Sequence, residues 1–261
     1  MSQQMQIGLY TSRSSGLHNL NPLTKLTLTG CLLAADFLAP NYWLPSVLFL
    51  LVVLPLSFWG KITVTIARIM SRAIVPIIIL LFVIQSLFYP GGKTVLFSFA
   101  IFSVKLEGVR FAFLTSTRLL TMVGALLLLL CTTHPSTLMA DLSSRGVPPT
   151  LIYIVSSTLQ LIPQVQAKAR TIIDAQQARG LETGGGPLSR VRALLPLLVP
   201  LVLSSLQETE ERAIALEARA FKARGRKTTL VVVPDSSRQS IIRTGLILLA
   251  IILIVGAYLW R

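Results

Sequence analysis

The sequence has few acidic residues and few of the side chains that build catalytic or metal sites. It contains 10 Asp and Glu against 24 Lys and Arg, and only two His and two Cys. Both cysteines lie inside apolar runs, which predicts small core residues and not a disulfide pair. The sequence shows no paired carboxylates in a polar setting, no nucleophile beside a base and no metal-ligand spacing. We therefore expect no enzyme, no metal site and no other cofactor.

Charged residues are also scarce overall, at 13% of the chain, while hydrophobic residues make up 53% and the mean hydropathy is +0.72. Such a composition is typical of an integral membrane protein. The formal net charge of +14 could suggest a nucleic-acid partner. However, the basic residues are not interleaved with aromatic ones, and no nucleic-acid motif is present. The positive-inside rule explains them better, since it places Lys and Arg in cytoplasmic loops. We expect no nucleic acid and a lipid bilayer as the surroundings.

Five apolar runs predict transmembrane helices. They cover residues 26–39, 43–59, 73–89, 109–131 and 241–260. Asp36 lies near a predicted turn, which favours an interfacial position. Arg118 lies within the fourth run and should face protein or water, because lipid exposure would cost roughly 2.5–3.5 kcal/mol.

Two shorter apolar runs, 151–162 and 193–206, are ambiguous. If the first crossed the membrane, the basic residues that follow it would lie outside, against the positive-inside rule. We therefore place both runs in the cytoplasm. The predicted fold is an all-α integral membrane protein with about five transmembrane helices and a cytoplasmic coupling domain of about three helices. The predicted divisions are a four-span part (1–134), the coupling helices (135–240) and a last transmembrane helix (241–261).

Most of the cytoplasmic charge lies around two similar signatures. Each is a helix-forming run that ends in an Ala-Arg step before Gly or Ala, at Ala178-Arg179-Gly180 and at Ala218-Arg219-Ala220. Each arginine could simply complement the dipole at a helix C-terminus. The repetition instead favours two helix ends that each present one arginine to a partner carboxylate.

With these motifs, the chain resembles the transmembrane T component of energy-coupling factor (ECF) transporters, the EcfT/CbiQ family. Matching features include His-x-Leu-x-Pro-x-x-Lys-Leu from His18 to Leu26, Ala-Gln-x-Ala-Arg-Gly from Ala175 to Gly180, and Glu-Ala-Arg-Ala-Phe from Glu217 to Phe221. Ala220 stands where many relatives have Gly. A second Ala-Arg-Gly step follows at Arg224, so the second contact arginine is either Arg219 or Arg224.

The resemblance implies a non-catalytic, multi-pass subunit of an ATP-driven importer in the plasma membrane of a prokaryote. Its implied partners are two ABC-type ATPase subunits, each docking one arginine, and one membrane-embedded substrate-binding S component. The substrate would be a vitamin, a vitamin precursor or a metal ion, and the sequence does not identify which. A possible contact surface for the S component is the apolar segment that contains Leu194, Leu197, Val199 and Leu201. The alternatives are a permease subunit of a conventional ABC importer and a membrane anchor without a transport role.

Overall fold

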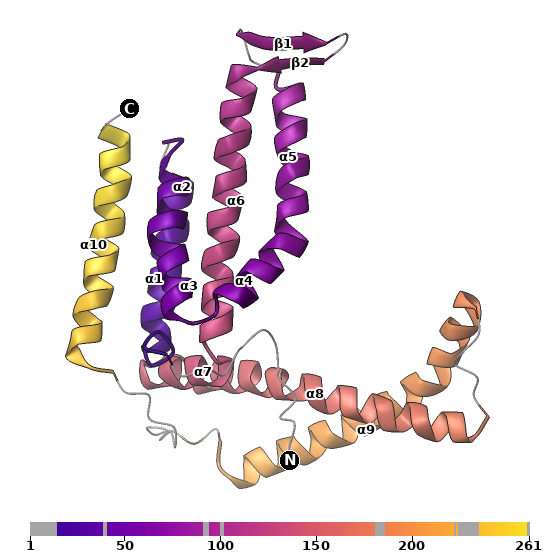
Figure 1. Ribbon diagram of the computed structural model, residues 1–261. Helices are drawn as coiled ribbons and strands as arrows, with labels where there is room; N and C mark the ends of the chain where they lie inside the picture. The colour runs from indigo at the N-terminus through magenta and orange to yellow at the C-terminus, as the bar shows by residue number, and fades with distance from the viewer. Residues whose placement is uncertain are drawn as a thin grey trace. The chain divides into compact units, whose positions relative to one another are not determined.

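A computed structural model shows an almost entirely helical protein (Figure 1). It describes residues 15–38, 41–90, 94–99, 102–180, 186–221, 223 and 235–259. The chain divides into two compact units. One, which we call the spanning unit, comprises the described residues of 8–142 and 231–261. The other, the α8–α9 unit, comprises those of 143–230.

The spanning unit contains all five predicted membrane helices. They are α1 (Pro22–Leu38), the run α2–η1–α3 (Leu44–Trp59), the run α4–η2–α5 (Thr63–Phe88), α6 (Leu106–Thr132) and α10 (Ser237–Leu259). By length and composition, the last three could each cross a membrane, and the first two are shorter. The prediction of an all-α membrane fold is confirmed. The assignment of sides, and with it the domain division, stays a prediction.

The structure adds two local features to the predicted spans. The basic stretch before the third span is continuous with it, because α4 (Thr63–Ile69) passes through a π-helical turn (Met70–Ile74) into α5 (Val75–Phe88). The loop before α6 forms a small antiparallel hairpin of β1 (Val95–Phe99) and β2 (Phe102–Lys105).

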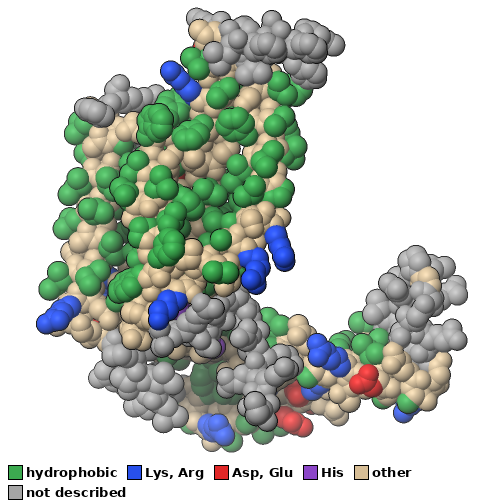
Figure 2. All heavy atoms as spheres, viewed as in Figure 1, with side chains coloured by type: hydrophobic (Ala, Val, Ile, Leu, Met, Phe, Trp, Pro, Cys, Tyr) green, Lys and Arg blue, Asp and Glu red, His purple; other side chains and the backbone are tan. Residues whose placement is uncertain are grey.

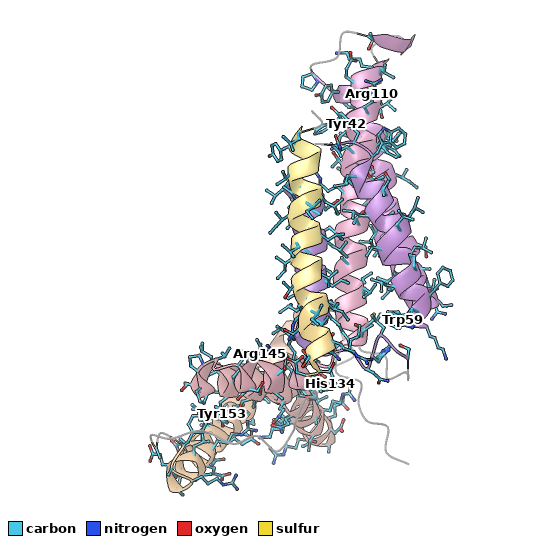
Figure 3. All side chains as sticks on the ribbon, turned by 90° about the vertical axis from the view of Figure 1, so that its left-hand side faces the viewer. Tyr42, Trp59, Arg110, His134, Arg145 and Tyr153 are labelled. Atoms are coloured by element: carbon cyan, nitrogen blue, oxygen red, sulfur yellow. The ribbon has the colours of Figure 1, made fainter. Side chains whose placement is uncertain are left out.

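The outer surface of the spanning unit matches a lipid environment. Figure 2 shows apolar side chains covering the helices, with basic side chains gathered towards their ends. Tyr42 and Trp59 lie at opposite ends of the unit in Figure 3. Tryptophan and tyrosine concentrate at the two membrane interfaces, so these residues mark the limits of the apolar layer.

The core of the spanning unit is built where α6 packs against α1, η1 and α4. Leu128 and Cys131 are almost completely buried there. Gly124 allows α6 to pack closely on η1, since a Cβ on it would lie 2.9 Å from a methyl group of Val53. A larger residue at this position would push η1 away from α6.

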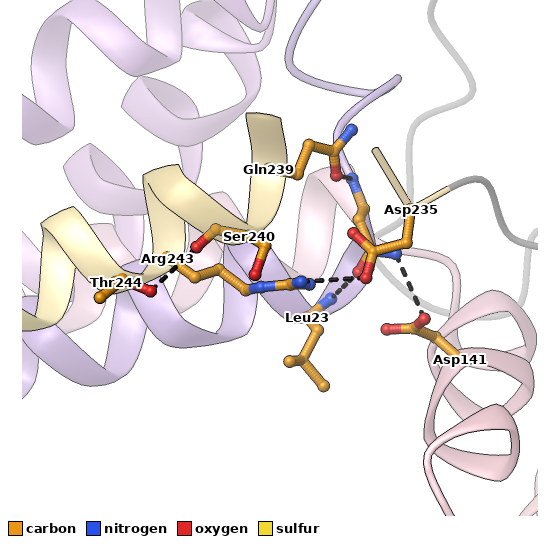
Figure 4. A network of polar contacts seen from close by, with 8 residues as sticks. Leu23, Asp141, Asp235, Gln239, Ser240, Arg243 and Thr244 are labelled. Atoms are coloured by element: carbon orange, nitrogen blue, oxygen red, sulfur yellow. Dashed lines mark hydrogen bonds and ion pairs between the residues drawn. The ribbon is translucent and has the colours of Figure 1, made fainter. Parts of the chain in front are cut away.

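Polar side chains fasten the N-terminal end of α1 to its neighbours (Figure 4). The Asn21 amide donates to Asp141 Oδ1 at 3.2 Å and accepts from the Leu23 N–H at 2.9 Å, while its backbone N–H donates to Gln239 Oε1 at 2.9 Å. Lys25, only 4% exposed, donates to the His18 and Thr132 carbonyls. The family-like motif from His18 to Leu26 therefore joins α1, α6, α7 and α10 within this unit.

Asp36 faces the interior of the spanning unit, and its expected interfacial depth in the membrane stays a prediction. This carboxylate is fully buried on α1, and its two oxygens have no hydrogen-bond partner among the described residues. The positive charge of Arg118 on α6 acts on it. Arg118 itself also lies over the Phe37 ring at 5.6 Å. An acid and a base from two different spans therefore lie near each other inside the spanning unit, and the attraction between them offsets part of the cost of burying the acid.

The described residues between α6 and α10 form three helices, as predicted. They are α7 (Pro135–Ser144), α8 (Pro149–Ala178) and α9 (Pro187–Ala218). Prolines stand at the start of all three, where the missing backbone N–H costs no intrahelical bond. Helices α8 and α9 form the α8–α9 unit and hold both arginine signatures.

Candidate functional site

The α8–α9 unit is an antiparallel pair of long helices. Contacts along it run in opposite chain directions. The Tyr153 ring packs on that of Phe221 at 5.2 Å between centroids, and Arg212 donates to Gln164 Oε1 at 2.6 Å. Further along α8, Lys168 forms an ion pair with Glu208. Because each residue later in α8 meets one earlier in α9, the C-terminal ends of the two helices lie at opposite ends of the pair.

The first signature forms the C-terminal end of α8. The helix stops at Ala178, and Arg179 follows with φ −88° and ψ 6°. Gly180 then takes a left-handed conformation with φ +92°, and its N–H donates to the Gln177 carbonyl at 2.9 Å. This is a common way for a helix to end, and glycine adopts it without steric cost. The arginine is thus held on the last turn beside a sharp change of chain direction.

The second signature ends α9 in almost the same way. Arg219 follows Ala218 with φ −87° and ψ 10°, and Ala220 is left-handed with φ +52°. The Phe221 N–H closes the turn on the Leu216 carbonyl at 3.0 Å. A left-handed alanine costs roughly 1–2 kcal/mol. The second signature therefore has the same helix ending as the first, although it lacks the glycine that would adopt it without steric cost.

The two arginines are equivalent in local structure but far apart. Both side chains are exposed. Arg179 lies about 26 residues beyond Tyr153 along α8, which at 1.5 Å of rise per residue is roughly 39 Å, and Tyr153 lies beside the second signature. The structure therefore does not bring the two arginines together. It presents them as two separate contact points, and Arg224 lies outside the described residues.

A shallow pocket adjoins the second signature. Its volume is about 410 Å³, and its walls include Tyr153, Leu216, Ala220 and Phe221. Figure 3 shows Tyr153 on α8. Sequence reasoning missed this residue, because the pairing of Tyr153 with Phe221 depends on the register of two helices far apart in the chain. The pocket gives the second contact point an apolar, partly aromatic lining next to its cation.

The ion pair in the middle of the α8–α9 unit shifts the titration of its acid. The Lys168 ammonium, hydrogen-bonded to Glu208, lowers the pKa of that carboxyl, and the charge of Arg212 acts in the same direction. The Lys168 ammonium also donates to Ser204 Oγ at 2.9 Å. A polar cluster thus links the two helices between the two signatures.

Within the α8–α9 unit, the apolar segment of α9 (193–206) is largely uncovered. Val199 is 63% exposed, and Leu197 and Leu201 are partly exposed. The side chain of Leu194 lies outside the part of the structure that is described. Pro196 and Pro200 stand inside the helix. Apolar side chains on several faces of one helix require cover from a membrane, a partner or the chain's own spans.

Comparisons with known proteins agree with one another. Residues 13–230 match the family model CbiQ, described as cobalt transport protein. A curated relative from Exiguobacterium sibiricum is 32% identical over 258 residues, covering 95% of this chain and 96% of the relative. One from Lactococcus lactis subsp. cremoris is 28% identical, covering 97% and 98%, and one from Listeria innocua is 31% identical, covering 85% and 86%. All three are described as the energy-coupling factor transporter transmembrane protein EcfT.

Proposed function

Because the chain belongs to the EcfT/CbiQ family, the transmembrane T components of energy-coupling factor transporters, we propose that it couples two ATPase subunits to a substrate-binding S component. The transporter would import a vitamin, a vitamin precursor or a metal ion across a prokaryotic plasma membrane. In this function the chain is a non-catalytic subunit, and the S component binds the cargo.

The observation that carries this proposal is the repeated helix ending. Arg179 and Arg219 occupy the same backbone conformation, each is followed by a left-handed residue, and both are exposed. A planar guanidinium can bind a carboxylate through two parallel hydrogen bonds. The turn after it carries only a hydrogen at Gly180 and a methyl group at Ala220, so a partner backbone can approach closely. Two such points roughly 39 Å apart suit two ATPase subunits better than one.

Co-purification tests the arginines. Arg179→Ala and Arg219→Ala should each weaken ATPase binding, and the double variant should lose it together with uptake. Truncating one partner of a buried, hydrogen-bonded charge pair typically costs about 2–5 kcal/mol. Lysine should restore little, because it lacks the planar fork. Arg170→Ala is the matched control, since Arg170 is an exposed arginine on α8 outside the signature.

Three outcomes of this experiment would change the proposal. Normal ATPase binding by the double variant would make both arginines ordinary helix ends. A loss with Arg170→Ala as large as that with Arg179→Ala would indicate general charge attraction. A larger effect of Arg224→Ala than of Arg219→Ala would assign the second contact to Arg224.

The uncovered segment of α9 is the part we assign to the S component. Leu194, Leu197, Val199 and Leu201 lie on it, and Val199 is exposed enough to accept a charge without disturbing the helix. Val199→Glu should leave membrane insertion and ATPase binding intact while releasing the S component. Ile214→Glu is the control, since Ile214 is 68% exposed on the same helix but outside the segment. Retention of the S component by Val199→Glu would show that the segment is covered by something else.

A further inference from the structure

One end of the spanning unit carries a pocket that the coupling function does not use. Its volume is about 530 Å³, and it is lined by Tyr42, Trp43, Phe82, Val109, Arg110 and Phe113. These residues come from the start of the α2–η1–α3 run, from α5 and from the first turns of α6. Figure 3 labels Tyr42 and Arg110 at this end of the unit, opposite Trp59. The pocket therefore lies at the depth of one aromatic belt.

The lining combines one cation with aromatic and aliphatic groups. The Trp43 and Phe113 rings are in contact, with centroids 5.8 Å apart. Tyr42 is 50% and Trp43 73% exposed. An indole N–H and a phenol O–H are hydrogen-bond donors on otherwise apolar rings, which is why both residues favour the boundary between headgroups and acyl chains. The remaining walls offer only hydrocarbon.

Arg110 is the charged member of this lining. No acid in the described part of the chain forms an ion pair with it. It also lies near the N-terminal end of α6, where the helix dipole favours an anion and disfavours a cation. An anion bound to the guanidinium would form charge-assisted hydrogen bonds and would also lie in the N-terminal half of the helix, on the positive side of its dipole.

We propose that this pocket binds the phosphodiester headgroup of an anionic membrane phospholipid. The phosphate pairs with the Arg110 guanidinium, the Tyr42 and Trp43 donors face the headgroup region, and the glycerol and upper acyl chains lie along Phe82, Val109 and Phe113. A bilayer supplies such a ligand at the depth where the pocket lies. This binding site goes beyond the proposed coupling function and does not depend on it.

Fluorescence of Trp43 provides the test. The chain has three tryptophans, so Trp59→Phe and Trp260→Phe leave Trp43 as the only one. The purified full chain, in neutral detergent, is titrated with phosphatidylglycerol carrying brominated acyl chains, which quench nearby indoles. We expect saturable quenching, with the midpoint shifted about 10–100-fold in Arg110→Gln, as expected for a lost charge-assisted bond. Arg238→Gln, an exposed cation on α10, should leave the midpoint unchanged.

The same titration has outcomes that would overturn the proposal. Equal midpoints for the unsubstituted chain and Arg110→Gln would exclude a headgroup site at Arg110. If millimolar inorganic phosphate displaced the brominated lipid, the site would be one for the free ion. Loss of Trp43 quenching on assembly with partner subunits would show that a protein covers the pocket. Labelling of the buried Cys131 thiol, unchanged in Arg110→Gln, controls for misfolding.

Discussion

The Asn21 side chain should stabilise the spanning unit through two hydrogen bonds at once. Its amide donates to the Asp141 carboxylate and accepts the Leu23 N–H at the start of α1. A hydrogen bond to a charged group contributes about 1.5–3 kcal/mol, and a helix N-cap about 1 kcal/mol. Asn21→Ala removes both, so the free energy of unfolding should fall by about 2.5–4 kcal/mol.

An exchange of donor and acceptor makes this test specific. Asn21→Asp keeps the helix cap but sets one carboxylate against another, so it should destabilise at least as much as Asn21→Ala. Adding Asp141→Asn to it restores an amide donor and a carboxylate acceptor in exchanged positions. The double variant should recover most of the loss, because the hydrogen bond can form again with one charge. Such recovery measures the coupling of the two positions directly.

Cys131 is a natural reporter for this experiment. It is completely buried in α6, and Cys31→Ala leaves it as the only thiol of the chain. When closing is faster than labelling, the rate of reaction with a thiol-specific dye follows the open population. Asn21→Ala should therefore raise this rate by about 100-fold or more. An unchanged rate, or a double variant no slower to label than Asn21→Asp alone, would refute the role given to this amide.

The remaining predictions concern the α8–α9 unit. Ala220→Gly should relieve the steric strain of the left-handed alanine and so increase the free energy of unfolding by up to about 1 kcal/mol, after the larger chain entropy of glycine is subtracted. Gly180→Ala should decrease the free energy of unfolding. The opposite order, measured as melting temperatures, would show that the two helix ends differ in backbone conformation. The pKa of Glu208 is lowered from its ordinary value of 4.5. The ionised carboxylate therefore contributes its full stabilisation above pH 4.5, and this stabilisation is lost as the pH falls through the lowered pKa. The melting temperature of the unit should decrease over that acidic range. Glu208→Gln or Lys168→Met should flatten the dependence of the melting temperature on pH. If neither variant changes it, another group is responsible for the acid sensitivity.

The sequence was enough to predict the helices and their endings. Apolar runs of membrane length predicted the spans, and the Ala-Arg steps indicated where α8 and α9 end. Local chemistry determines such features: Pro149 and Pro187 suit a first turn, and Gly180 suits a left-handed end. The departure at Ala220 was visible as a residue type, but its positive φ was not, since alanine adopts it only under constraint from its surroundings.

Pairings between distant segments were not predictable in the same way. The burial of Asp36 depends on how α1 packs on α6, and a position near a turn gave no sign of it. The contact of Tyr153 with Phe221 likewise depends on the register of two helices. A single sequence records periodicity and local propensity, and neither determines which faces of two helices meet. Charged residues inside apolar runs, such as Asp36 and Arg118, were nevertheless the available indication that a partner was needed.

Under the proposed function, the part of the chain that joins the two ATPase contacts must move as one body over the distance between them. Within the α8–α9 unit, the described links are spread along the pair, at Tyr153 with Phe221 and at Lys168 with Glu208. Pairs of packed helices resist bending where such links are frequent. Proline removes a backbone donor from a helix, and Pro196 and Pro200 do so in α9. Figure 1 shows α9 bent towards its N-terminal end. Both prolines lie inside the uncovered apolar segment, so the helix is weakest there. A partner bound to this segment would follow changes of the bend. The part of α9 that is linked to α8 would carry Arg219 without deforming.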